Sequence, residues 1–292
     1  MNEMLAASDL PWYAFLTLLS IAWGACIGSF LNVCIYRIPL ELSVVSPGSH
    51  CPSCKKPIRW FQNIPVLAYL FLRGKCARCG VRISPRYAVV ELLTALLFLL
   101  AWLKFDMAGG SRPLGLVPVT DLLLVPVFWL VIMGLVLGTF VDFEHMIIPD
   151  RVTLGGIACG LAASALVPSL HGETTVTASL MRGAIGAAFG FGLLWSVAML
   201  GEFVFKKEAM GFGDVKLMGA IGAFFGWQAV CFTVLISSFA GTLVGLTLIA
   251  TGRKEMQSRI PYGPYLALAA LLWLFWGSSW WDLYIAFIAP NR

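Results

Sequence analysis

One carboxylate stands directly behind two glycines in the stretch Gly211-Phe-Gly-Asp214, at the mouth of an apolar run. A charged group at a membrane boundary is costly, and where one occurs it usually has a function. The glycines place no side chain beside the acid, so an extended substrate backbone could lie against Gly211 and Gly213. A single carboxylate is a poor hydrolytic catalyst. Peptide hydrolysis would therefore require a second acid within reach of Asp214.

A second carboxylate, Asp142, closes another apolar run. Two aspartates held about 3 Å apart cannot both ionise at neutral pH, and they therefore share one proton. The ionised member can activate a water as general base while the protonated member polarises the scissile carbonyl. This chemistry requires neither a metal nor a covalent intermediate. Asp142 and Asp214 are therefore the candidate catalytic pair.

The acids near Asp142 also have a plainer interpretation, as residues that end or cap helices and face lipid headgroups. Asp150 follows Pro149 at the start of a predicted span, which favours the capping role. For Asp142 and Glu144 the composition leaves both roles open. Lys216 lies two residues beyond Asp214 and would not share its face of a helix.

Four of the eight cysteines lie in a polar loop as two pairs, Cys51-Pro-Ser-Cys54 and Cys76-Ala-Arg-Cys79. Two such pairs supply four thiolates that can close a tetrahedral zinc site, although the 21 residues between the pairs slightly exceed the usual spacing of about 15–20. Four cysteine ligands leave no open position for a substrate, so a structural zinc is predicted. Reduced or redox-active thiols are the alternative, because a cytoplasmic loop disfavours a disulfide.

The composition indicates a polytopic membrane protein. Of the 292 residues 59% are hydrophobic and 12% are charged, with a mean hydropathy of +0.86, whereas soluble chains carry about 25% charged residues. Glu3 and Asp9 precede the first apolar run, so no cleaved secretory leader is expected. Runs long enough to cross a bilayer, about 20 residues each, predict an all-α fold. We expect eight transmembrane helices, at 11–37, 85–104, 119–141, 151–169, 181–204, 213–229, 230–250 and 264–288.

The distribution of Lys and Arg predicts the orientation of these helices. Of the 20 basic residues, all but four fall in the loop at 38–84, its flanks, or later loops on the same side. The four exceptions are Lys104, Arg112, Arg182 and Arg292. The 38–84 loop is therefore predicted to be cytoplasmic, with both termini outside. Two predicted spans separate Asp142 from Asp214, which places both carboxylates on the cytoplasmic face. Topology accounts for the net charge of +5, and no nucleic-acid partner is indicated.

Glu91 lies several residues inside the second predicted span, where a buried acid needs a partner. A ligand contact and a structural hydrogen bond or ion pair both fit this position. Between the cysteine pairs, residues 58–67 mix aromatic and basic side chains. This mixture fits a loop on the membrane surface and equally a segment packed on the cysteine lobe.

In this order, the motifs resemble the bacterial prepilin peptidases, also called type IV leader peptidases, which are membrane aspartic proteases of the G-x-G-D kind. The resemblance runs almost end to end, and the order of the strings is far more specific than any one of them. The strings are Gly28-Ser-Phe-Leu-Asn-Val33, the double C-x-x-C loop with Asn63-Ile-Pro65, Arg86-Tyr87 leading to Val90-Glu-Leu-Leu-Thr94, Asp142 with Pro149-Asp150, Gly211-Phe-Gly-Asp-Val-Lys-Leu217, and Pro261-Tyr-Gly-Pro264.

The resemblance implies that Asp142 and Asp214 cut the short basic leader from prepilins and pseudopilins, on the cytoplasmic side and just before a phenylalanine. It further implies N-methylation of the new N-terminus with S-adenosylmethionine, an activity associated with the 38–84 loop and its cysteines. Glu91 is the candidate contact for that cofactor. One polytopic unit over 1–292 would then hold this loop and a peptidase core over 105–292. The expected location is the bacterial inner membrane, and the expected partners are the prepilin substrates and the bilayer. No oligomeric state is predicted.

Two positions depart from the family pattern. Phe61-Gln62 stands where a tyrosine–acid pair is more usual before Asn63, and Ala88 stands where a proline is common after Arg86-Tyr87. Both positions belong to the part associated with methyl transfer, so a peptidase without methyl transfer is the alternative function.

Two other classes of protein fit the sequence less well. A proton-coupled transporter would need acids at several membrane depths or an internal repeat, and the sequence shows neither. A zinc-dependent hydrolase would need an open, histidine-rich site, whereas His50, His145 and His171 are scattered along the chain.

Overall fold

The computed structural model describes residues 10–104, 123–206, 210–252 and 261–288, and within these ranges the protein is helical with no β-strand. The predicted all-α membrane fold is therefore confirmed. Several residues used in the sequence predictions lie outside the described ranges. They are Glu3, Asp9, residues 119–122 at the expected start of the third span, and the basic residues Arg112, Lys207, Arg253, Lys254, Arg259 and Arg292. The chain forms two compact units, Met1–Leu137 and Gly138–Arg292.

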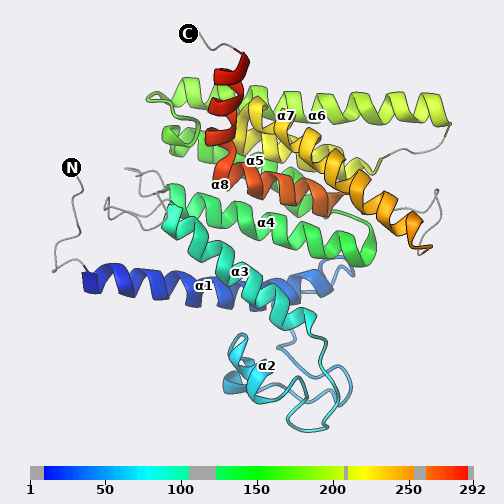
Figure 1. Cartoon of the computed structure of the whole chain (residues 1–292). Coiled ribbons are helices and arrows are strands. Elements are labelled where there is room, and N and C mark those ends of the chain that lie inside the picture. Colours follow the sequence, from blue (N-terminus) through cyan, green and yellow to red (C-terminus); the bar gives the residue numbers. More distant parts are fainter. Residues whose placement is uncertain (1–9, 105–122, 207–209, 253–260, 289–292) are drawn as a thin grey trace. The chain divides into compact units, whose positions relative to one another are not determined.

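The first unit is built on α1 (Leu10–Arg37) and α3 (Arg86–Lys104), which pack against each other. The helices approach closely at two glycines of α1. A Cβ added at Gly24 would lie 2.8 Å from the Ala95 Cα, and one added at Gly28 would lie 2.7 Å from the Glu91 Cα. The loop between them carries η1 (Trp60–Asn63) and α2 (Leu67–Phe71), and Figure 1 shows it beyond the ends of both helices.

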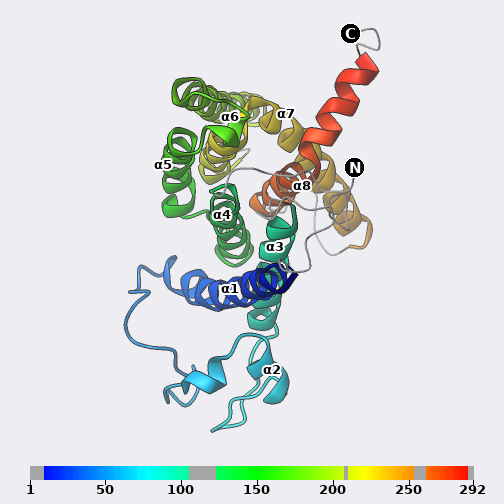
Figure 2. The same ribbon diagram turned by 90° about the vertical axis from the view of Figure 1, so that its left-hand side faces the viewer.

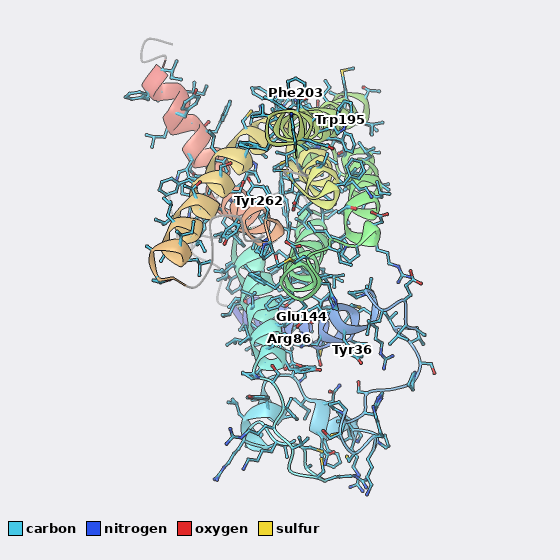
Figure 3. The ribbon with its side chains drawn as sticks, turned by 90° about the vertical axis from the view of Figure 1, so that its right-hand side faces the viewer. Tyr36, Arg86, Glu144, Trp195, Phe203 and Tyr262 are labelled. Atoms are coloured by element: carbon cyan, nitrogen blue, oxygen red, sulfur yellow. The ribbon has the colours of Figure 1, made fainter. Side chains whose placement is uncertain are left out.

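The second unit contains α5 (Asp150–Leu166), η2 (Pro168–His171), α6 (Val176–Phe205), α7 (Phe212–Ala250) and α8 (Gly263–Ile288). The last turns of α4 (Leu124–His145) also belong to it. Helix α7 packs against α5, α6 and α8, and Figure 2 shows α5, α6 and α7 as neighbours. Large apolar side chains such as Trp195 and Phe203 on α6 are exposed (Figure 3), as expected for a surface that faces lipid.

Small residues allow α6 and α7 to pack backbone against backbone. A Cβ at Gly186 would overlap the carbonyl oxygen of Gly222, and a Cβ at Gly222 would overlap the carbonyl oxygen of Gly186. A Cβ at Gly190 would likewise overlap the carbonyl oxygen of Met218. Stripes of small residues are a common way for membrane helices to associate.

The spans predicted at 213–229 and 230–250 correspond to the two helical segments of α7, which has 39 residues in all. The segments meet at a kink at Gly226, where φ is 79° and ψ is 176°, a few residues before the predicted boundary. At 1.5 Å per residue a straight helix of this length would measure about 58 Å, roughly twice the hydrocarbon thickness of a bilayer. The Ser164 hydroxyl donates to the Gly160 carbonyl at 2.8 Å and contacts His171 Nε2 at 2.9 Å. It also lies 3.4 Å from the carbonyl oxygen of Ala223, three residues before the kink.

Among the described residues five helices are long and apolar enough to cross a membrane, namely α1, α3, α4, α6 and α7. Helix α8 becomes a sixth if its two segments, which meet at 76°, form one span. The predicted span at 151–169 is represented by α5, which has 17 residues. Each of the eight predicted spans therefore corresponds to a helical segment, but among the described residues only five or six helices are long and apolar enough to cross a membrane.

Candidate active site

Asp142 lies near the end of α4 and is 5% exposed. Its Oδ2 accepts a hydrogen bond of 3.0 Å from the backbone N–H of Gly263, the first residue of α8. The first N–H groups of a helix have no partner within the helix, so the carboxylate satisfies one of them. A Cβ added at Gly263 would lie 2.8 Å from the same oxygen. The absence of a side chain at Gly263 is thus what allows this close contact.

Asp214 lies in the first turn of α7 and is 7% exposed. Gly211 caps this helix with an extended backbone, and its carbonyl accepts the Asp214 N–H at 3.1 Å. Among the described residues Asp214 Oδ1 is buried and has no hydrogen-bond partner. A buried polar atom normally has one. Asp214 Oδ1 is therefore available to a water or a substrate group.

The structure brings the two aspartates close enough to interact electrostatically. Ile148, which is 8% exposed, lies against the start of α7, which carries Asp214, and against the start of α8, which donates to Asp142. A Cβ added at Gly213 would lie 3.2 Å from the Ile148 Cβ, and one added at Gly263 would lie 3.0 Å from its Cδ1. Gly213, next to Asp214, and Gly263, at the start of α8, thus both contact the side chain of Ile148. This shared contact holds the start of α7 near the start of α8.

The other acids of this region lie in different surroundings. Glu144, labelled in Figure 3, is exposed although it is only two residues from Asp142. Asp150 is the first residue of α5 and is also exposed, and it pairs with Lys216 Nζ at 2.6 Å. The hydrogen bond from Lys216 holds the pKa of Asp150 below its usual range. Asp142 and Asp214 are therefore buried, whereas Glu144 and Asp150 are exposed. The sequence alone did not show whether Asp142 belongs with the buried or with the exposed acids.

The four loop cysteines form a compact cluster that could bind a metal ion, with all four Sγ atoms within 4.8 Å of one another. The Cys51 and Cys79 sulfurs are 3.8 Å apart. A tetrahedral site with Zn–S bonds of about 2.3 Å has sulfur–sulfur edges of about 3.8 Å. Backbone N–H groups of Cys79 and Arg78 lower the pKa of Cys76 to about 6, which favours its thiolate, whereas burial and the neighbouring cysteines raise the pKa of Cys79 to about 11.

The two cysteine pairs share one backbone pattern. The N–H of Cys51 donates to the Lys56 carbonyl and that of Cys76 to the Val81 carbonyl, in each case five residues on. The carbonyls of the same two cysteines accept from Lys55 and Gly80, in each case four residues on and both with positive φ. The chain thus forms the same turn twice, and the cysteine sulfurs of both turns lie together in one cluster.

Glu91 is buried on α3, where its Oε2 accepts the Val66 N–H at 2.7 Å and its carboxylate also bonds the Ser29 hydroxyl. Val66 has a φ of 60°, which is rare for a β-branched residue, so this bond holds a strained turn in place. Of the two roles left open by the sequence, the structure shows the structural hydrogen bonds. A contact with a cofactor stays a prediction.

Comparisons with known proteins give the family. The profile described as "Bacterial Peptidase A24 N-terminal domain" matches residues 22–105, and that described as "Type IV leader peptidase family" matches residues 129–246. Proteins named prepilin leader peptidase/N-methyltransferase are similar over most of the chain. That of Aeromonas hydrophila is 37% identical over 94% of both chains, and that of Pseudomonas aeruginosa is 34% identical over 92% of this chain and 93% of its own. The chain belongs to the type IV leader peptidase family.

Within this type IV leader peptidase, both aspartates fall in the second matched region, while the four cysteines and Glu91 fall in the first. The protein of that name from Myxococcus xanthus is 39% identical over 84% of this chain and 68% of its own. No solved structure shows significant similarity to the chain.

Sequence reasoning missed the residues that support Asp142 in this peptidase. Tyr262 lies at the start of α8 (Figure 3), and its hydroxyl bonds those of Ser237 at 2.7 Å and Ser238 at 3.3 Å on α7. These bonds fix the turn whose next residue, Gly263, donates to Asp142. The sequence marked Pro261-Tyr-Gly-Pro264 as one of the strings of the family resemblance but gave it no role beside Asp142, because a backbone donor leaves no side-chain pattern.

Proposed function

We propose that this chain removes the leader peptide from type IV prepilins and pseudopilins with Asp142 and Asp214 as its catalytic pair. The observation that carries this proposal is the pair itself, because two buried carboxylates interact and one oxygen of Asp214 has no partner among the described residues. Paired acids of this kind hydrolyse peptides in other aspartic proteases. The proposed setting is the bacterial inner membrane, with the pair facing the cytoplasm as the basic loops predict.

The two acids divide the work of hydrolysis. The ionised carboxylate takes a proton from a water, whose oxygen attacks the scissile carbonyl carbon, while the protonated carboxyl donates to the carbonyl oxygen. Collapse of the tetrahedral intermediate breaks the C–N bond as the leaving nitrogen takes up a proton. The Gly263 N–H holds Asp142 Oδ2 in one orientation, and the unpartnered Asp214 Oδ1 has room for the reacting groups.

The approach to Asp214 suits an extended substrate chain. Gly211 is exposed, and among the described residues an added Cβ would meet only Asp214 Oδ2 there, at 3.3 Å. A substrate backbone could therefore lie over Gly211 next to the acid without meeting a side chain. The apolar segment of a prepilin would remain in the bilayer, since the exposed faces of the neighbouring helices are themselves apolar.

Gly263→Ala is expected to slow the cleavage of a prepilin-like peptide by detergent-purified protein about 10- to 100-fold. The new methyl group would displace Asp142 Oδ2 from its N–H donor, and a shift of about 1 Å at a catalytic group has an effect of this size. Gly155→Ala on α5 is the matched control, because its Cβ would meet only the Asp150 carbonyl, at 3.9 Å. Equal rates for both variants would show that Gly263 does not position Asp142.

We further propose that the four-cysteine cluster holds a structural zinc ion and that the same enzyme N-methylates the new N-terminus, as the names of its relatives suggest. When bound, S-adenosylmethionine supplies an electrophilic methyl group, which the terminal amine takes from the sulfonium sulfur with loss of a proton. Cys51, Cys54, Cys76 and Cys79 would hold the metal, and a closed site of this kind contributes folding energy. The zinc would therefore act by ordering the loop.

Purified protein is expected to contain about one zinc ion per chain by elemental analysis, because a closed tetrahedral site takes one ion from four thiolates. Cys51→Ser should lose most of this metal, whereas Cys159→Ser, an exposed cysteine on α5, should keep it. We expect leader cleavage to survive in both variants, since the aspartates belong to the other unit. Wild-type protein that contains no zinc after purification without chelators would contradict the assignment.

A further inference from the structure

A cavity of about 340 Å³ lies in the first unit beside the C-terminal half of α1, and its size is within the range of small-molecule sites, about 300–1,000 Å³. One stripe of α1 forms a wall, with Ser29, Phe30, Val33 and Arg37 at helical spacing. The segment around Gly48 and the turn at Asn63 form the other walls. Neither the catalytic aspartates nor the cysteine cluster lines this space.

Arg37 gives the cavity an unusual charge. It is 8% exposed, and its guanidinium donates to the carbonyls of Ser43 at 2.8 Å and Pro47 at 2.6 Å. Among the described residues it has no acidic partner. Buried charges in proteins are normally paired. A buried cation that lines a cavity and meets only neutral acceptors is therefore suited to a ligand that carries a carboxylate.

The rest of the wall is suited to an uncharged, planar group. Phe30 and Val33 offer an aromatic and an aliphatic surface, and Asn63 and Ser49 add hydrogen-bonding side chains. A pocket with an apolar wall, a few polar side chains and one cation fits an amino acid joined to a nucleoside. S-adenosylmethionine is an amino acid joined to a nucleoside in this way, with a carboxylate and an ammonium group at one end, a sulfonium in the middle and an adenine ring at the other end.

Glu91 does not line this cavity but bonds residues in or next to its walls. Its carboxylate bonds Ser29, which lines the cavity on α1, and the Val66 N–H, next to the lining residue Pro65. One buried side chain thus ties together two walls that lie far apart in sequence. Glu91 would act as a positioning residue here, so its predicted link with the cofactor would run through Ser29 and the turn at Val66.

We propose that the cavity between α1, the segment around Gly48 and the Asn63 turn is the S-adenosylmethionine site, in which Arg37 binds the carboxylate of the methyl donor. This proposal rests on the proposed methyl transfer, because that activity requires such a site. It goes further by naming the place and the residue that recognises the cofactor.

Binding of labelled S-adenosylhomocysteine to the purified full-length protein, measured by equilibrium dialysis without substrate, tests the site. Arg37→Gln should weaken binding about tenfold or more, since it removes a charge-assisted contact. Gly48→Trp should also weaken it by filling the cavity, whereas Gly48→Ala, whose Cβ meets nothing within 4 Å, should bind as wild type does. Arg59→Gln, an exposed arginine of the same loop, is the charge control. Zinc content and the thermal unfolding profile identify variants that remain folded.

Photochemical cross-linking of labelled S-adenosylmethionine to the wild type gives a second result that depends on no variant. Label in peptides that cover 26–37 or 44–49 would support the cavity, and label confined to 138–292 would overturn it. Wild-type binding that both Arg37→Gln and Gly48→Trp retain would overturn it as well. A wild type that neither binds the compound nor methylates a cleaved pilin would refute the proposed methyl transfer itself, and the site with it.

Discussion

Asp142→Asn and Asp214→Asn should each abolish leader cleavage, with an expected loss of about 10³-fold or more. An amide can neither take a proton from water nor share one with the opposite carboxylate, so either change removes the proton transfer on which both halves of the mechanism depend. The substitution nearly conserves shape, and in Asp142→Asn the new amide oxygen could still accept the Gly263 N–H bond. We therefore expect both variants to purify as folded protein. Cleavage of a prepilin-like peptide, followed by mass spectrometry, measures the loss.

The neighbouring acids provide matched controls for this experiment. Asp150→Asn and Glu144→Gln change exposed carboxylates close in sequence to Asp142, and both should keep cleavage within a few-fold of wild type. Methylation of an already cleaved pilin should also survive in the two aspartate variants, because that activity is assigned to the other unit. Near-normal cleavage by either Asp142→Asn or Asp214→Asn would show that the catalytic pair is wrongly assigned.

Gly222→Val should disrupt the packing of α6 against α7 and cause a large loss of stability. A side chain at Gly222 would overlap the backbone of Gly186, which cannot move without separating the two helices. Overpacking usually costs about 1–3 kcal/mol, and a backbone clash lies at or beyond the upper end of that range. Thermal unfolding in detergent, with the yield of monodisperse protein, measures the effect.

Gly192→Val on α6 is the matched control for this stability prediction. A Cβ at Gly192 meets nothing within 4 Å, and the replacement has the same small effect on helix propensity. The control should unfold within a few degrees of wild type. Equal melting temperatures for the two variants would mean that the α6–α7 contact at Gly222 is looser than the structure shows.

From the two apolar runs that separate Asp142 and Asp214, the sequence predicted that both acids lie on one face of the membrane. The structure brings the two carboxylates close enough to interact, while of the two intervening helices α6 is long enough to span a membrane and α5 has only 17 residues, so the shared membrane face stays a prediction. The sequence was sufficient for the four-cysteine cluster, since the spacing within each C-x-x-C pair is a local property. It divided 213–250 between residues 229 and 230, whereas the kink lies at Gly226, because an uninterrupted apolar stretch contains no sharp signal for a boundary. Short and bent helices such as α5 and α8 likewise read as ordinary spans.

The supports of the candidate site were harder to predict for a different reason. The Gly263 N–H that holds Asp142 is a backbone group, and 121 residues of chain separate the two partners. Ile148 looked like any other apolar residue, and only the packing of glycines against it gives it a positioning role. Glu91 was conspicuous in the sequence as a buried acid, but its partners, Val66 and Ser29, come from a loop turn and another helix.

Mass spectrometry of a prepilin-like substrate incubated with the purified protein and S-adenosylmethionine tests the central claim most directly. We predict a product that has lost its leader and gained one methyl group on the new N-terminal residue, with cleavage absent in Asp142→Asn and Asp214→Asn. A cleaved but unmethylated product would leave the catalytic pair in place and refute the methyl transfer. An intact substrate after incubation with folded wild-type protein would contradict the account as a whole.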